Sequence, residues 1–212
     1  EQLRMSMLEV ITPAADRTLL SVQELRAAAS VSNASSDAAL AALGDEIAVA
    51  IARACNVAVA GASVPTLRSE VVRETFRLTC ATGTIVLSRR PVTAIASITL
   101  NGEAMAADGY EFDAGAGLLY RLDGDNRSWW MGSSKVVVTY TAGYADVPVD
   151  IRMAAKKMVT EMWAATTRDP NLKRVVIEGI GEREYWVPPT TDPLVSSEVM
   201  DLLAPYRNVW VA

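Results

Sequence analysis

Carboxylates are the residues of this sequence whose types and spacing come closest to a chemical site. Asp108, Glu111 and Asp113 follow one another closely enough to be imagined as a general acid and base. The run from Asp123 to Asn126 could begin a calcium loop, but it lacks the other ligands and the closing glutamate of an EF-hand. Neither spacing indicates a site, and we interpret the second run as a solvated hairpin turn. A carboxylate-dependent hydrolase stays a remote alternative, which two close carboxylates in a deep cleft would support.

The other side chains of catalytic chemistry are missing or badly spaced. The 212 residues include no histidine, which excludes a His-based triad, a Cys–His pair and an HExxH zinc site within this chain. Cys55 and Cys80 have no second pair of cysteines with which to bind zinc. Gly179 and Gly181 are not followed by the Lys-Ser or the helix start of a phosphate-binding loop. We expect a protein that is not an enzyme and that needs no cofactor or metal.

The charge balance bears on the partners. Lys and Arg number 20 against 25 Asp and Glu, a net charge of −5, which argues against a broad nucleic-acid-binding face. The chain opens without a charged and then apolar leader, so we expect no export, reduced thiols and a buried Cys55. The apolar stretch 38–62 carries Asp45, Glu46 and Arg53, charges that are costly inside a bilayer. It is interpreted as a soluble helix, and no membrane partner is expected.

Three groups of residues inside the chain are candidates for protein contacts. Arg89 and Arg90 precede a proline, where they could touch a phosphate or an acidic neighbouring subunit, or form a solvated turn. Trp129 and Trp130 are adjacent, so on an extended segment they point in opposite directions. One of them is then available to a partner, unless it covers the edge of its own sheet. Trp163 is a candidate for helix contacts between subunits, or for the core of its own subunit.

The C-terminus departs most from an ordinary globular sequence. After Pro205 the chain carries an aromatic and β-branched tail, where chain ends are usually poorly ordered. Such a tail either packs on its own subunit or lies in another protein as an added strand or anchored peptide. The candidate docking residues are Tyr206, Arg207, Asn208, Val209, Trp210 and Val211.

Helices are predicted in the first part of the sequence. Ser21 and Glu24 have the spacing of a capping box, which begins a helix that we expect to end near Val31. A second helix presents one apolar stripe and stops between Asn56 and Gly61. The stripe consists of Leu40, Leu43, Ile47, Ile51 and Ala54.

Strands and then further helices follow. From Leu67 to Tyr140 the apolar period is two, which predicts an antiparallel β unit with a hairpin turn at Asn101-Gly102. Helical spacing returns at Pro148 and ends before Pro170, and a short strand is expected at 175–177. A last helix, beginning between Asp192 and Ser197, ends before Pro205.

The predicted fold is α+β, with a small core of about four helices, an inserted antiparallel β unit and an extended C-terminal tail. Residues 1–62 and 146–204 are assigned to the helical core, 63–145 to the β insert and 205–212 to the docking tail.

Three stretches, in this order, carry a resemblance to a known family. The first is the proline-led strand from Leu87 to Ile98, followed by a hairpin and the strand Tyr110 to Asp113. The second runs from Val138 to Tyr144 and leads through a Val-Pro step into the helix that ends near Trp163. The third is the closing stretch 199–207. Together they resemble the head-to-tail adaptor family of tailed bacteriophages, also called head-tail connector or head completion proteins, with versions in prophages and gene transfer agents.

The resemblance implies a structural role in a virion. It implies a ring of about twelve copies under the portal protein, which docks on the portal through the C-terminal tail. The ring extends the DNA channel toward a stopper or tail protein, and DNA passes through it without sequence-specific binding. It implies assembly in the bacterial cytoplasm and a place at the head–tail junction. A stopper or tail-terminator protein of the same particle is the alternative, and a tail packed on its own subunit favours it.

Overall fold

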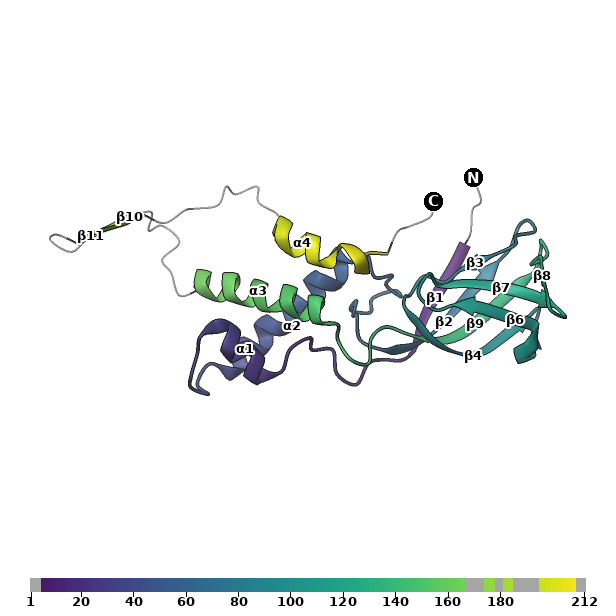
Figure 1. Ribbon diagram of the computed structural model, residues 1–212. Coiled ribbons are helices and arrows are strands. Elements are labelled where there is room, and N and C mark those ends of the chain that lie inside the picture. The colour runs from purple at the N-terminus through teal and green to yellow at the C-terminus, as the bar shows by residue number, and fades with distance from the viewer. Residues whose placement is uncertain (1–4, 167–173, 178–180, 185–194, 209–212) are drawn as a thin grey trace. The chain divides into compact units, whose positions relative to one another are not determined.

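The computed structural model of the protein describes residues 5–166, 174–177, 181–184 and 195–208. The chain forms two compact units and passes between them after Arg17, Ala54, Pro148 and Pro205. We call residues 18–54 and 149–205 the helical unit, and residues 1–17, 55–148 and 206–212 the β unit. Each unit is described by itself, and Figure 1 shows their elements.

Four helices make up the described core of the helical unit. They are α1 (Val22–Ala29), α2 (Asp37–Ala54), α3 (Val149–Thr166) and α4 (Ser197–Leu203), followed by the short 3₁₀ turn η2 (Ala204–Tyr206). Helix α3 packs against the other three, so it is the central element of the bundle. Its buried residues recur every three or four positions, as the sequence pattern predicts. The side chains buried between the helices include Leu25, Leu40, Ile47, Ile51, Ile151, Met158, Val199 and Leu203.

Charged residues link the helices at the bundle surface. The predicted capping box is present, since the Glu24 amide donates to Ser21 Oγ at 3.3 Å and the Ser21 amide donates to Glu24 Oε2 at 3.0 Å. Glu24 also accepts from Lys156 Nζ of α3 at 2.9 Å. A short, bidentate ion pair joins Arg26 to Asp37 at the start of α2. One carboxylate therefore both caps α1 and ties it to α3.

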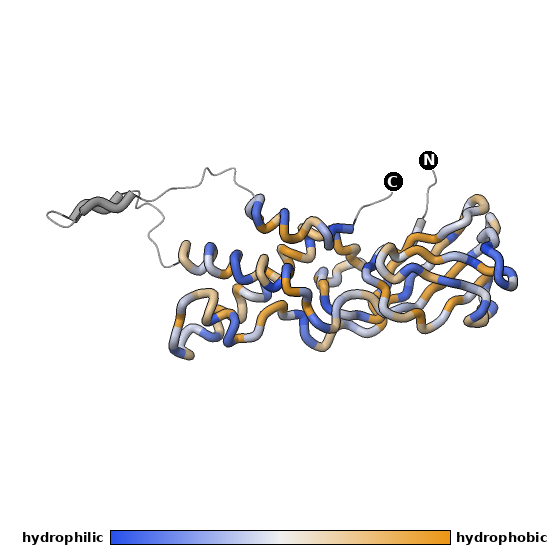
Figure 2. Tube along the Cα trace, in the orientation of Figure 1, coloured by the Kyte–Doolittle hydropathy of each residue, from blue (hydrophilic) through white to orange (hydrophobic). Residues whose placement is uncertain are grey.

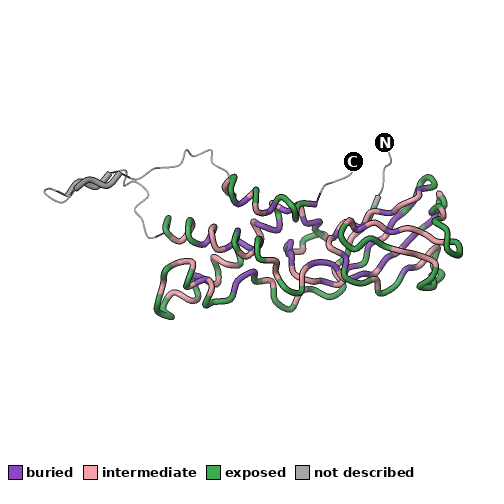
Figure 3. The backbone as a smooth tube through the Cα atoms, in the orientation of Figure 1, coloured by how far each residue is buried: buried purple, intermediate pink, exposed green. Residues whose placement is uncertain are grey.

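The larger sheet of the β unit has five antiparallel strands in the order β1-β2-β9-β4-β5. Strands β2 and β9 each bury every second side chain (Figure 3). The alternation follows the period of two that the sequence predicts, and it places Val72, Glu74 and Phe76 together on the buried face. The strands are β1 (Met5–Thr12), β2 (Glu70–Arg77), β9 (Lys135–Ala142), β4 (Val92–Leu100) and β5 (Glu103–Ala104).

A second sheet covers the inner face of the first. It contains β3 (Ile85–Val86), β7 (Leu118–Asp123), β6 (Tyr110–Asp113) and β8 (Asn126–Ser128), with the 3₁₀ turn η1 (Ala107–Gly109) before β6. Hydrophobic residues from both sheets make one core, and hydropathy alternates along the strands (Figure 2). Phe76, Val138 and Ile98 enter it from the large sheet, while Leu119 and Trp130 enter it from the small sheet and the segment after it.

A buried polar network crosses the inner face of the large sheet. Glu70 is 1% exposed and pairs with Arg89 Nη2 at 2.8 Å. Glu74 accepts from Tyr140 Oη at 2.8 Å and from the Ser88 amide at 3.0 Å. Burial, with the Glu74 carboxylate next in importance, raises the pKa of Tyr140 well above its usual range, so this phenol remains a donor. The network fixes the segment 88–89 against β2.

The observed fold is α+β, as predicted, and two further strands, β10 (Arg174–Ile177) and β11 (Gly181–Glu184), include the expected strand at 175–177. The boundary of the first segment differs from the sequence assignment. Residues 5–12, assigned to the helical core with the rest of 1–62, form β1 of the β unit because they pair along β2. Among the described helices, none combines the length and the apolar character needed to span a bilayer.

Candidate interaction surfaces

The C-terminal segment is held on the β unit by a pair of asparagines. The Asn208 amide donates to the Cys55 carbonyl at 2.9 Å. Asn56 Nδ2 donates to the Asn208 carbonyl at 3.1 Å, and Asn208 Nδ2 donates to the Asn56 carbonyl at 3.3 Å. Asn208 is only 8% exposed, so these bonds replace water contacts that its amide has lost. We call Cys55, Asn56 and Asn208 the C-terminal clamp.

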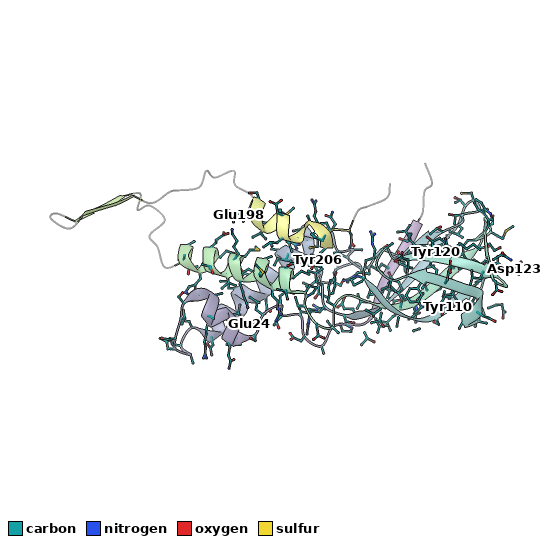
Figure 4. All side chains as sticks on the ribbon, viewed as in Figure 1. Glu24, Tyr110, Tyr120, Asp123, Glu198 and Tyr206 are labelled. Carbon is teal, nitrogen blue, oxygen red and sulfur yellow. The ribbon has the colours of Figure 1, made fainter. Side chains whose placement is uncertain are left out.

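Two tyrosines support the clamp. The rings of Tyr144 and Tyr206 meet edge to face, with centroids 6.0 Å apart and planes at 79° (Figure 4 labels Tyr206). Burial raises the pKa of Tyr144, and Tyr206 and Cys55 add to the shift. Burial also raises the pKa of the Cys55 thiol to about 11. Cys55 is therefore a protonated core thiol, and Cys55 and Cys80 form no disulfide.

These contacts divide the predicted docking tail. Tyr206 and Asn208 lie against their own β unit, and Arg207 between them is exposed. Val209, Trp210 and Val211 lie outside the described residues. No sequence signal pointed to the partner of Asn208, because Asn56 lies 152 positions away and both residues are polar.

The adjacent tryptophans point in opposite directions, as the extended segment requires. Trp130 is fully buried, its backbone pairs with Thr82, and its ring N–H donates to the Leu119 carbonyl at 3.4 Å. Trp129 is 61% exposed, and Met131, two positions on, is similarly exposed. The residue available to a partner is therefore Trp129, with Met131 beside it.

Arg89 and Arg90 lie in different surroundings and make different contacts. Arg89 is buried, and besides Glu70 it donates to the Thr66 carbonyl at 3.0 Å. Arg90 is half-buried and donates to the Ala116 carbonyl at 3.4 Å. Arg89 is thus a structural ion-pair residue of the β unit. Trp163, on the last turns of α3, is half-buried.

Two of the carboxylates considered for chemistry, Glu111 and Asp113, make structural contacts. Glu111 pairs with Arg127, whose guanidinium lies over the Tyr120 ring at 3.8 Å. Asp113 Oδ1 accepts from the Ala116 amide at 2.9 Å in the turn between β6 and β7. In the part of the chain that the structure describes, no three potential ligands gather to hold a metal ion.

The comparisons with known proteins identify the family. The model of the head completion protein family matches residues 18–209, which is most of the chain. The chain belongs to the head completion protein family. The resemblance read from the sequence is thereby confirmed. A search of curated proteins finds no match for this head completion protein.

Solved structures share the fold of this head completion protein along nearly its whole length. One is a chain of the neck of an empty gene transfer agent (GTA) particle computed with C6 symmetry, with 20% identity and a TM-score of 0.58. Others come from the virion of a native GTA particle, with a TM-score of 0.56, and from the neck of a native particle computed with C12 symmetry, with a TM-score of 0.53; both are 20% identical. In each case the match covers 97% of both chains. These structures establish the fold.

Proposed function

We propose that this protein is a structural virion protein of the head–tail junction that assembles as a closed ring between the portal and the stopper or tail. The observation that carries the proposal is the full-length fold match to chains of particle necks, which were computed with C6 and C12 symmetry. Membership of the head completion family supports the same place in the particle. A ring of about twelve copies would extend the channel through which DNA leaves the head.

The clamp refines the proposed contact with the portal. Because Tyr206 and Asn208 are held on the β unit, the parts of the predicted tail left to bind the portal are the exposed Arg207 and residues 209–212. Trp210 is its large apolar side chain, and such a residue makes a strong anchor in a pocket of a partner. Tyr206 and Asn208 then act as positioning residues that set where the tail leaves the β unit.

The packing of the C-terminal segment on its own β unit also favours a second candidate function. A stopper or tail-terminator protein needs no portal-docking tail, and the packing of Tyr206 and Asn208 on their own β unit suits such a protein. The two candidates differ in whether residues 209–212 bind the portal.

Co-sedimentation with purified portal rings of the same genetic element distinguishes these candidates. The full chain is compared with a chain that lacks 209–212 and with Trp210→Ala, all of which keep the clamp. The adaptor proposal expects binding near one copy per portal subunit, and its loss in both variants. Glu161→Gln, at an exposed position of α3, is the control that should still bind. Absence of binding by the full chain would support the stopper candidate instead.

A further inference from the structure

The outer face of the large sheet in the β unit presents two cations directly opposite one another. Strands β2 and β9 pair antiparallel, and Arg77 lies directly opposite Lys135. Both side chains are exposed, on the face that points away from the core. Like charges in this cross-strand position repel one another and destabilise a sheet. The chain nevertheless places them together, although its net charge is −5.

Another arginine on this face has an ion-pair partner within the chain. Arg73 pairs with Glu9 of β1 at 3.5 Å. Within the described residues, no carboxylate makes an ion pair with Arg77 or Lys135. Two cations at directly opposite positions, without an ion-pair partner among the described residues, point to an anionic group supplied from outside them.

The rest of the face has the chemistry of a protein interface. Thr75 and Val137 lie opposite one another, and Arg73 lies opposite Thr139. Met7, opposite Thr75 on β1, is 70% exposed. Methionine and apolar β-branched side chains suit the centre of a contact between proteins. A face built to hold DNA would instead carry many cations, because each phosphate contact needs one.

The second sheet of the same β unit carries exposed carboxylates. Asp123 and Asp125 lie at the turn between β7 and β8, and Asp108 lies in η1, which contacts β7 (Figure 4 labels Asp123). All three are exposed, and in the described part of the chain none of them makes an ion pair. We call Asp108, Asp123 and Asp125 the acidic tip. The cationic pair and the acidic tip therefore belong to opposite sheets of one sandwich.

We infer that the outer face of the large sheet docks a second copy of this chain, with Arg77 and Lys135 of one copy against the acidic tip of the next. Two different, complementary surfaces on one chain make a head-to-tail contact, and such contacts close into rings. This inference rests on the proposed function and deepens it, because it names the β-unit surfaces that join neighbouring copies of the ring.

Charge reversal tests the inference in the full-length protein. One variant carries Arg77→Glu and Lys135→Glu, and a second carries Asp123→Lys and Asp125→Lys. Each alone presents like charges at every contact, so we expect its self-association to weaken by at least about tenfold in sedimentation velocity. An equal mixture of the two should associate again as alternating copies, since every contact then joins opposite charges. Arg53→Glu, at an exposed position of α2, is the control that should associate like the unchanged chain.

Each outcome decides the inference. Recovery in the mixture supports it, and circular dichroism of each variant checks that the fold is kept. An unchanged chain that stays monomeric at every concentration, or reversal variants that associate normally, would overturn it. Loss of binding to a short DNA duplex with unchanged self-association would assign the face to DNA and also overturn it. None of these results bears on portal binding, so the proposed function stands or falls separately.

Discussion

Asn56 and Asn208 exchange side-chain-to-backbone hydrogen bonds across 152 positions of sequence. Asn56 has a positive φ of 53°, a backbone conformation that asparagine tolerates better than most residues. The last described residue is thus tied to the first residues after α2. The contact joins two parts of the β unit that lie far apart in the sequence.

Removing the Asn208 side chain should loosen the end of the chain. Asn208→Ala deletes one hydrogen bond and leaves the Asn56 carbonyl without that donor, so we expect the free energy of unfolding to fall by about 1 kcal/mol in urea titrations. Arg207→Ala is the matched control, because its side chain is exposed, and it should cost less than half as much. Equal losses in the free energy of unfolding for the two variants would mean that the Asn208 side chain does not stabilise the protein.

Glu24 predicts an acid-dependent loss of stability in the helical unit. Hydrogen bonds from Lys156 and then from the Ser21 amide lower the pKa of Glu24 from 4.5 to about 2. A lowered pKa means that the stabilisation is complete above the unfolded value, near pH 4.5, and is lost as the pH falls toward 2. Glu24→Gln should therefore cost about 1 kcal/mol at neutral pH, since the pair is partly exposed.

The difference between the unchanged chain and Glu24→Gln should shrink as the pH falls from 4.5 through 2. Thermal unfolding followed over this range measures it. Glu161→Gln, an exposed residue of α3, is expected to show no such change. A difference in stability that stays constant with pH would show that the charge of Glu24 does not cause the stabilisation.

Substitution of Arg89 should destabilise the β unit more than substitution of most of its other charged residues. Arg89→Ala leaves the Glu70 carboxylate buried, with the Ala14 amide at 3.2 Å and the more distant Arg17 guanidinium at 3.6 Å as its remaining described partners. Stranding a buried charge in this way costs about 3 kcal/mol. Arg127→Ala removes a surface ion pair with Glu111 and should cost at most about 1 kcal/mol in the same denaturant titration. A ranking in the opposite order would contradict the role given to the buried network.

Gly117 and Gly124 form a matched pair for testing the position of Arg90. Both have a positive φ, of 64° and 60°, so alanine is strained at either site. A Cβ at Gly117 would lie 2.7 Å from Arg90 Cγ, whereas one at Gly124 meets no atom within 4 Å. Gly117→Ala should therefore destabilise by about 1 kcal/mol more than Gly124→Ala. In an Arg90→Ala background the two costs should become equal, and a persistent gap would count against this contact.

The sequence predicted those parts of the fold that depend on local pattern. The capping box at Ser21, the apolar stripe of α2 and the alternation of β2 each follow from neighbours within a few positions. The opposite directions of Trp129 and Trp130 follow from the same rule. Which of the two enters the core depends on the pairing of Trp130 with Thr82, which no local pattern contains.

Features that depend on contacts between residues far apart in the sequence could not be predicted from local pattern. Residues 5–12 become a strand because they pair along β2, whose nearest residue lies more than fifty positions away. From the sequence Arg89 is interpreted as a surface cation, because its ion pair with Glu70 forms only in the folded β unit. The clamp and the cationic pair at Arg77 and Lys135 likewise need the register of strands and ends that meet only in the folded β unit.

Electron cryomicroscopy of particles from the same genetic element, compared with particles made without this chain, tests the central claim most directly. The account predicts a closed ring of density in contact with the portal, into which the β unit and the helical bundle fit, and which is missing from the second sample. Density for this chain elsewhere in the particle, away from the portal, would contradict it.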